Sequence, residues 1–267
     1  MISWAVFTPH PPLLVPEIGG SMLERVADTK QSLEKLFEEV DSQVDSLVVM
    51  TPHSHASVDK VMVSSGKQLE GRLAQFGGAK KLTFKVDRSL SQFLITGLEE
   101  AGLPAQLKAL PDGSAVESID HGAYVPLYYA EQVMDASPDL TILNPGLFAP
   151  DKIWKAGKVL GQRLENEDKR IGVIISGDLS HKLSRNAPAG YHPRAHLFDQ
   201  QVKEWLEAKQ PNKLLEVDQE LLAEAGECGY RPLIMGSSLV QEHGYRNCRV
   251  LSYEAPFGVG YLVARIL

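Results

Sequence analysis

The chain has 267 residues, of which 43% are hydrophobic and 23% are charged, a composition typical of folded globular proteins and not of disordered ones. Its formal net charge of −7 comes from 27 basic and 34 acidic residues without a basic run, so we expect no nucleic-acid partner and no membrane partner. Two cysteines are too few for a disulfide framework, and no apolar run approaches the roughly 20 residues that cross a bilayer, so we expect a cytoplasmic protein.

Strand-like apolar runs alternate with helical patterns along the chain. The predicted strands are, in chain order, 2–7, 46–50, 61–64, 82–86, 140–143, 172–175, 250–253 and 260–266. The predicted helices are 21–40, 90–101, 125–134, 150–165, 194–208, 218–225 and 232–243. This alternation predicts a single α/β domain over residues 1–267, with a central mixed, mostly parallel sheet flanked by helices on both faces. The last two strands are expected to pair antiparallel at one side.

The first two predicted strands are each followed directly by Thr-Pro-His, at 8–10 and at 51–53. Proline removes a backbone donor and biases the residue before it towards extended geometry, so each imidazole is expected in the loop just beyond its strand. Ligands of open α/β sheets gather beyond the carboxyl ends of the strands. His10 and His53 are therefore predicted to converge on one metal ion.

Two further histidines occupy similar positions. His121 follows Asp120 just ahead of a predicted helix, and His181 comes shortly after the predicted strand 172–175. A single histidine of this kind is more often structural than functional, but four in matched settings favour one shared site. Asp120 directly precedes His121, and Asp178 lies three residues before His181. Either carboxylate could orient an imidazole through its far ring nitrogen. Asp120 could equally well cap the helix.

Outside these positions the chain offers weaker signals. His55 shares an extended segment with His53, so it is a candidate next to the site, although only one of the two needs to reach the metal. Surface positions are favoured for the other histidines, which are His192, His196 and His243. No glycine-rich phosphate loop, GxSxG elbow or CxxC motif competes with a histidine site.

A metal held by two imidazoles needs a third ligand, and a carboxylate would complete the facial triad that suits non-haem Fe(II). Among the 34 acidic residues, Glu227 is the most unusual, because it lies in a short joint bounded by Gly226 and Gly229 between two predicted helices. An ordinary loop glutamate, or a charge at a helix N-terminus, is the commoner interpretation of such a residue. Both interpretations stay open at this point.

Several short motifs extend the pattern over essentially the whole chain. They are Thr-Pro-His-Pro-Pro at 8–12, Thr-Pro-His at 51–53, Asp-His-Gly at 120–122, Ser-Gly-Asp-Leu-Ser-His at 176–181, Gly-Glu at 226–227 and Tyr-Glu-Ala-Pro-Phe-Gly-Val-Gly-Tyr at 253–261. In this order and spacing, the chain resembles the LigB-like class III extradiol ring-cleavage dioxygenases. The tail resembles most the branch of that family that holds the AmmeMemoRadiSam system protein B and the Memo proteins.

The resemblance implies a fold, a site and an activity. The fold is one α/β domain around a mixed sheet, and the implied metal ligands are His10, His53 and Glu227. His181 matches the acid/base histidine and His121 a second histidine of the substrate pocket. The implied protein is an Fe(II)-dependent dioxygenase of aromatic compound catabolism that opens a catechol-type ring. Its partners are then a small aromatic diol and O2, and a homo-oligomer is compatible with the sequence.

Cys228 keeps two alternatives open, because it adjoins the implied ligand Glu227. A thiolate favours zinc or copper over iron, so zinc or another divalent metal is the alternative cofactor. One alternative is a Memo-like metal-binding or partner-binding protein without dioxygenase activity. The other is a zinc-dependent hydrolase on the same site, with His181 as the general base beside a zinc-bound water.

Overall fold

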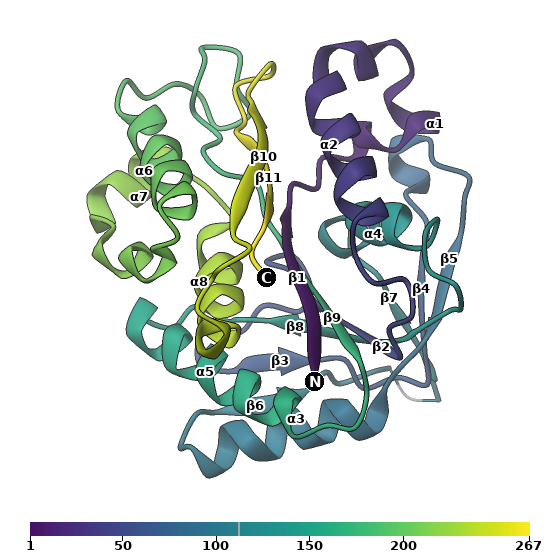
Figure 1. The fold of residues 1–267 in the computed structure, drawn as a ribbon. Coiled ribbons are helices and arrows are strands. Elements are labelled where there is room, and N and C mark those ends of the chain that lie inside the picture. The colour runs from purple at the N-terminus through teal and green to yellow at the C-terminus, as the bar shows by residue number, and fades with distance from the viewer. Residues whose placement is uncertain (112) are drawn as a thin grey trace.

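A large mixed sheet organises the computed structural model, which describes residues 1–111 and 113–267 (Figure 1). From one edge to the other, its eight strands are β10 (Arg249–Glu254), β11 (Tyr261–Arg265), β1 (Ile2–Thr8), β9 (Ile171–Ser176), β2 (Ser46–Met50), β8 (Asp139–Asn144), β3 (Val61–Val63) and β6 (Ala105–Leu107). The four strands from β1 to β8 in this order are parallel to one another. β10 and β11 are antiparallel at one side, as the sequence predicts. The predicted α/β class with a mixed, mostly parallel sheet is confirmed.

Helices cover both faces of this sheet (Figure 1). One face packs against α2 (Ala27–Glu38) and α4 (His121–Ala130). The other packs against α3 (Arg88–Glu100), α5 (Pro150–Glu165), α6 (Ala195–Glu207), α7 (Gln219–Ala225) and α8 (Tyr230–Leu239). Shorter helical turns are α1 (Pro16–Gly19) and the 3-10 turns η1 (Pro12–Leu14), η2 (Gly20–Val26), η3 (Ala74–Phe76), η4 (Pro211–Glu216) and η5 (Gln241–His243).

The central strands are buried on both faces, which explains their continuous apolar runs. Along β1, the side chains of Trp4 and Val6 join the core under α2 and α4, whereas those of Ala5 and Phe7 join the core on the opposite face. All four side chains are fully buried. This two-sided burial fixes the register of the central strands, and therefore the places where their carboxyl ends meet.

A second, three-stranded sheet consists of β5 (Leu82–Lys85), β4 (Gln68–Gly71) and β7 (Val116–Ser118). The predicted strand 82–86 belongs to this sheet and not to the large one. The sequence did not indicate β4, β6 or β7, because these strands are only three or four residues long and carry few buried apolar side chains. Such strands depend on their neighbours more than on their own composition.

Two helix starts differ from the predictions by more than two residues. The predicted helix 21–40 begins as the 3-10 turn η2, and α-helix starts only at Ala27. The helix predicted from 125 starts at His121, because the Asp120 carboxylate accepts the backbone N–H of Ala123 and acts as the N-cap. This earlier start makes His121 the first residue of α4. Within the described residues, no helix has both the length and the apolar character needed to cross a membrane.

Candidate metal centre

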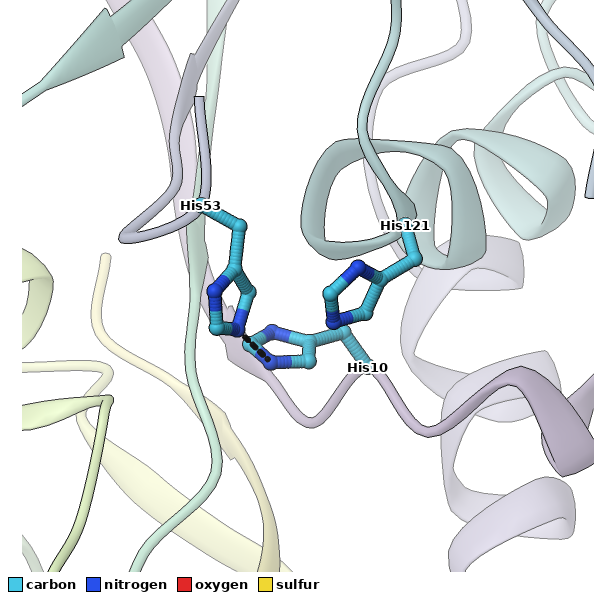
Figure 2. Close-up of side chains that lie close together, drawn as sticks. All are labelled: His10, His53 and His121. Atoms are coloured by element: carbon cyan, nitrogen blue, oxygen red, sulfur yellow. Dashed lines mark hydrogen bonds between the residues drawn. The ribbon is translucent and has the colours of Figure 1, made fainter. Parts of the chain in front are cut away.

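Three histidines from distant parts of the chain converge beyond the carboxyl end of the sheet (Figure 2). His10 follows β1, His53 follows β2, and His121 begins α4. The Nε2 atoms of His10 and His53 are 3.1 Å apart, and the potential ligand atoms of all three histidines lie within 4.8 Å of one another. The structure thus brings together three of the four histidines that the sequence singles out.

His10 is the buried member of this group, with only 2% of its surface exposed. Its backbone N–H donates to Oδ1 of Asp178 at 3.0 Å, and its ring Nδ1 lies 2.9 Å from Oγ of Ser176. The Ser176 hydroxyl in turn donates to the carbonyl oxygen of Gly122 at 2.5 Å. His10 is therefore held through its main chain and through its ring.

His53 is exposed, and its ring contacts those of His10 and His121. Its ring stacks on that of His121, with the centroids 4.3 Å apart and the planes inclined by 26°. Its backbone N–H donates to Oγ1 of Thr51, and the Thr51 hydroxyl donates to Oδ1 of Asp120 at 2.9 Å. A Cβ at Gly122 would lie 2.5 Å from that Thr51 oxygen, so this close approach needs glycine. Asp120 thus links the end of β2 to the start of α4.

A thiol and a second carboxylate lie on another side of His10. Sγ of Cys228 is 3.5 Å from Nε2 of His10, and Oδ2 of Asp178 is 3.8 Å from the same nitrogen. The segments that carry them touch directly, because a Cβ at Gly177 would lie 2.2 Å from Cα of Gly229. Asp178, Cys228 and His10 form a second group of potential ligands that shares His10 with the first.

Glu227 lies outside both of these groups. Its Oε2 accepts the backbone N–H of Tyr230 at 2.5 Å, at the start of α8. Burial raises the pKa of its carboxyl to about 7. The assignment of Glu227 as a ligand stays a prediction, and its contacts in the structure are those of a helix-capping carboxylate.

Of the two remaining candidate histidines, His181 lies beside the second group of potential ligands and His55 lies at the surface. The Nε2 of His181 is 3.9 Å from Sγ of Cys228, and its backbone N–H donates to the carbonyl of Ala225, so it borders the second group. His55 is exposed, and its ring makes no hydrogen bond within the part of the chain that the structure describes. The rings of His192 and His243 lie 3.7 Å and 3.0 Å from the carboxylates of Glu224 and Glu165, and neither ring belongs to these groups.

Burial controls the protonation of the central groups. Burial, followed by the neighbouring His53 and His121, lowers the pKa of His10 well below that of a free imidazole, so His10 is neutral near pH 7. The side chain of His53 is exposed, but desolvation by the neighbouring side chains, followed by the nearby His121, still lowers its pKa. Burial raises the pKa of the Asp178 carboxyl, and it raises that of the Cys228 thiol well above its usual value. Neutral imidazoles are the form that binds metals, whereas this thiol becomes a thiolate only with a cation beside it.

The sequence marks Cys228 only as a neighbour of Glu227, and it suggests no role for Ser176. Cys228 reaches the site because the backbones of Gly177 and Gly229 touch and bring two segments together that are distant in sequence. No local pattern in the sequence reports that contact.

Comparison with known proteins places this geometry in a family context. The model of the family described as "Catalytic LigB subunit of aromatic ring-opening dioxygenase" matches residues 4–264. A curated relative from Clostridium acetobutylicum, named Protein CA_C1420, is 24% identical over 263 residues, which cover 97% of this chain. The chain spans 56% of the length of that relative.

Proposed function

This chain belongs to the LigB family of catalytic subunits of aromatic ring-opening dioxygenases, and from this membership we propose that it is a metal-dependent enzyme that opens a catechol-type ring with O2. The observation that supports the proposal most strongly is the pair of Nε2 atoms of His10 and His53, 3.1 Å apart beyond two strands of the parallel sheet. Open α/β sheets bind ligands at this edge. The proposed substrates are a small aromatic diol and O2.

The donor set fits a divalent transition metal. Two imidazole nitrogens that face each other at 3.1 Å must share either a proton or a cation, because two lone pairs repel. A carboxylate oxygen and a thiol sulfur lie within 4 Å of the His10 nitrogen, and both are ordinary metal ligands. Imidazole and carboxylate ligands suit Fe(II), which is the metal we propose for the dioxygenase reaction.

The identity of the third metal ligand, after His10 and His53, differs between two versions of this proposal. The family resemblance favours Glu227, whereas the contacts favour Asp178 or Cys228, which already lie beside His10. Glu227 would first have to release the backbone N–H of Tyr230. Metal stoichiometry in Glu227→Gln, Asp178→Asn and Cys228→Ser decides between these carboxylates and the thiol, since only the loss of a true ligand removes metal.

The other side chains have distinct proposed tasks. When bound, the metal supplies Lewis acidity to a phenolic hydroxyl and a template that brings the ring and O2 together. We assign proton transfer to His181, whose Nε2 lies next to Cys228 and outside the histidine group. His121 presents its ring beside His53, and the exposed ring of Phe76 lies 6.3 Å from that of His121. The planes of the Phe76 and His121 rings are inclined by 61°, so the two rings offer an aromatic substrate edge and face contacts beside the histidines.

Cys228 favours a second candidate function. A thiolate at 3.5 Å from Nε2 of His10 would make the site softer and better suited to zinc or copper than to iron. The alternative function is then metal binding without oxygen chemistry, or hydrolysis by a zinc-bound water with His181 as the base.

One experiment separates the two candidates. Protein prepared without oxygen is analysed for bound metal, loaded with Fe(II), and tested for O2 uptake with a panel of catechols. One iron per chain, together with O2 uptake and a yellow ring-opened product, supports the dioxygenase. Zinc or copper that Fe(II) loading does not displace, or bound iron without uptake on any catechol, contradicts it and favours the second candidate.

A further inference from the structure

The hydroxyl of Ser176 lies between a ring nitrogen and a carbonyl oxygen. Its Oγ is 2.9 Å from Nδ1 of His10 and 2.5 Å from the carbonyl oxygen of Gly122. Ser176 is the last residue of β9 and is fully buried, so no water competes for either contact. A serine hydroxyl has one proton to donate, and the two contacts therefore constrain each other.

The carbonyl of Gly122 can only accept, which fixes the position of that proton. At 2.5 Å, two oxygens that both presented lone pairs would repel, so the Ser176 proton points at Gly122. The Ser176 oxygen then has only lone pairs left for His10, and Nδ1 of His10 must be the donor. The hydrogen bonds run in one direction, from His10 through Ser176 to Gly122.

We propose that Ser176 is a positioning residue that holds His10 as the Nδ1–H tautomer and so keeps a bare Nε2 lone pair directed at the metal position. A neutral imidazole carries one N–H, and the hydrogen bond made by one ring nitrogen decides which form the other takes. The Nε2 of His10 is the atom that faces both His53 and Cys228. The consequence for metal binding rests on the proposed metal site, whereas the tautomer itself does not.

The neighbouring imidazole is held less firmly. His53 is exposed, and its Nε2 faces Nε2 of His10. With a bare His10 Nε2, the metal-free protein is expected to carry the shared proton on Nε2 of His53. Because His53 meets solvent, it can exchange that proton through water for one on its own Nδ1, so that its Nε2 is bare when a metal binds, without any change at His10.

The position of Ser176 in the sheet explains how the hydroxyl reaches both partners. Ser176 pairs in register with Thr8 of the parallel strand β1, two residues before His10, and the next backbone N–H after β9 donates to the Thr8 carbonyl. Gly122 lies in the first turn of α4, over the same sheet edge. The hydroxyl therefore connects β9, α4 and the loop after β1. Alanine at this position would leave the ring Nδ1–H of His10 without its acceptor.

The first test determines the tautomer of His10 in the unaltered protein, and it needs a variant only to assign the His10 signals. In the metal-free full-length chain, two-bond ¹H–¹⁵N correlation spectra of the histidine rings report which nitrogen carries the proton, and the His10 signals are assigned by their loss in His10→Gln. We expect His10 to show a protonated Nδ1 and a bare Nε2. A protonated Nε2 at His10 overturns the proposal.

Variants then test the role of Ser176. Ser176→Ala is expected to populate both His10 tautomers and to weaken Zn(II) binding, measured by calorimetry, about 10- to 100-fold, the usual effect of removing a partner that orients a ligand. Ser176→Thr keeps the hydroxyl on a side chain suited to a strand and is expected to restore both readouts. An unchanged tautomer in Ser176→Ala, or weaker Zn(II) binding without a tautomer change, overturns the assignment.

A matched control separates this role from general packing. Ser91→Ala removes another buried serine hydroxyl, which lies in α3, contacts Thr141 and is far from the histidines in sequence. This control is expected to leave the His10 spectrum and the Zn(II) affinity unchanged, so the same losses in Ser91→Ala overturn the assignment to Ser176. Zn(II) binding with the expected tautomer but no O2 uptake contradicts the proposed function alone, which keeps the two failures distinct.

Discussion

The ends of β1 and β2 carry the same three residues, Thr-Pro-His, and yet the structure treats their histidines differently. His10 is buried and held by Ser176 and Asp178, whereas His53 is exposed and rests on His121 from one side. The difference comes from the surroundings of each strand end. The continuation of β9 packs over the end of β1, with the Gly177 N–H bonded to the Thr8 carbonyl, but the chain after β2 turns towards the surface.

In the proposed metal site, one local motif thus supplies two kinds of ligand. By the proposed role of Ser176, the buried copy presents a nitrogen whose direction and tautomer are set before a metal binds. The exposed copy can adjust its ring and exchange its proton with water. In such a site the buried imidazole needs little reorganisation when a metal binds, and the exposed imidazole leaves a route by which the metal can enter.

Removing each imidazole in turn is the most direct way to break the comparison. We expect His10→Ala to lose the metal completely, and His53→Ala to retain weak binding, because His121 and Cys228 remain near His10 in the second variant. Metal content after desalting and Zn(II) calorimetry measure both effects. Equal losses in the two variants would show that burial does not distinguish the two strand ends.

His181→Ala tests whether proton transfer is separate from both ligands. The variant is expected to keep its metal and to lose about 10²- to 10⁴-fold in turnover, the usual contribution of general acid–base catalysis. Metal stoichiometry and O2 uptake measured on the same preparation separate the two effects. The control is His196→Ala, an exposed histidine of α6. Turnover at the wild-type level in His181→Ala would remove this role.

Asp178→Asn tests whether the carboxylate charge beside the buried His10 contributes to metal binding. Asparagine keeps an acceptor for the His10 backbone N–H but removes the negative charge 3.8 Å from the ring Nε2. We expect metal affinity to fall about 10- to 100-fold, with little change in the fold. Calorimetry with Zn(II) measures the affinity, and circular dichroism checks the fold. An unchanged affinity would mean that the charge of Asp178 does not act on the metal.

The two imidazoles should also respond differently to acid. Burial lowers the pKa of His10 further than that of His53, while both have the ordinary value of 6.5 once the chain unfolds. Below pH 6.5 the unfolded chain therefore binds protons that the folded chain does not, and the free energy of unfolding falls as the pH falls.

Urea unfolding of the metal-free protein at about pH 7.5 and about pH 5 measures this loss of stability. His10→Gln is expected to reduce this pH-dependent loss of unfolding free energy more than His53→Gln does. The opposite order would contradict the assignment of His10 as the more deeply buried base.

The smallest effect is expected at the exposed end. Thr51→Val removes the hydroxyl that links the His53 backbone to Asp120. We expect a loss of about 1 kcal/mol in the free energy of unfolding, the typical net value of a hydrogen bond, and a slight loss of metal affinity. Urea unfolding and calorimetry measure the two. A loss of affinity as large as that of Asp178→Asn would show that the Thr51 link matters as much as the buried contacts.

Much of this arrangement can be predicted from sequence, because its signals are local. Proline after a buried apolar run marks a strand end, and this places His10 and His53 at the same edge of a parallel sheet. The Asp120 cap and the antiparallel pair β10 and β11 follow from equally local patterns. The predicted helix 150–165 coincides with α5, since its apolar residues repeat with helical spacing and Pro150 marks its start.

The features that could not be predicted depend on contacts between distant segments. Cys228 joins His10 only because two glycine backbones touch, and Ser176 reaches His10 only through the register of β1 and β9. The unequal burial of the two strand ends has the same origin. The resemblance points to Glu227, but the residue next to it is the one that contacts the imidazole.

For the proposed metal site, the exposed side of His53 has a consequence for how a metal ion would reach the ligands. A ligand that meets solvent lets an ion enter and leave without opening the core, so exchange with the surrounding pool should be fast compared with unfolding. Affinity for divalent ions follows a general order among metals, and selection in cells depends partly on supply. The metal recovered with this protein is therefore expected to follow the composition of the growth medium, and preparations from iron-rich and zinc-rich cultures should differ in content while sharing one fold.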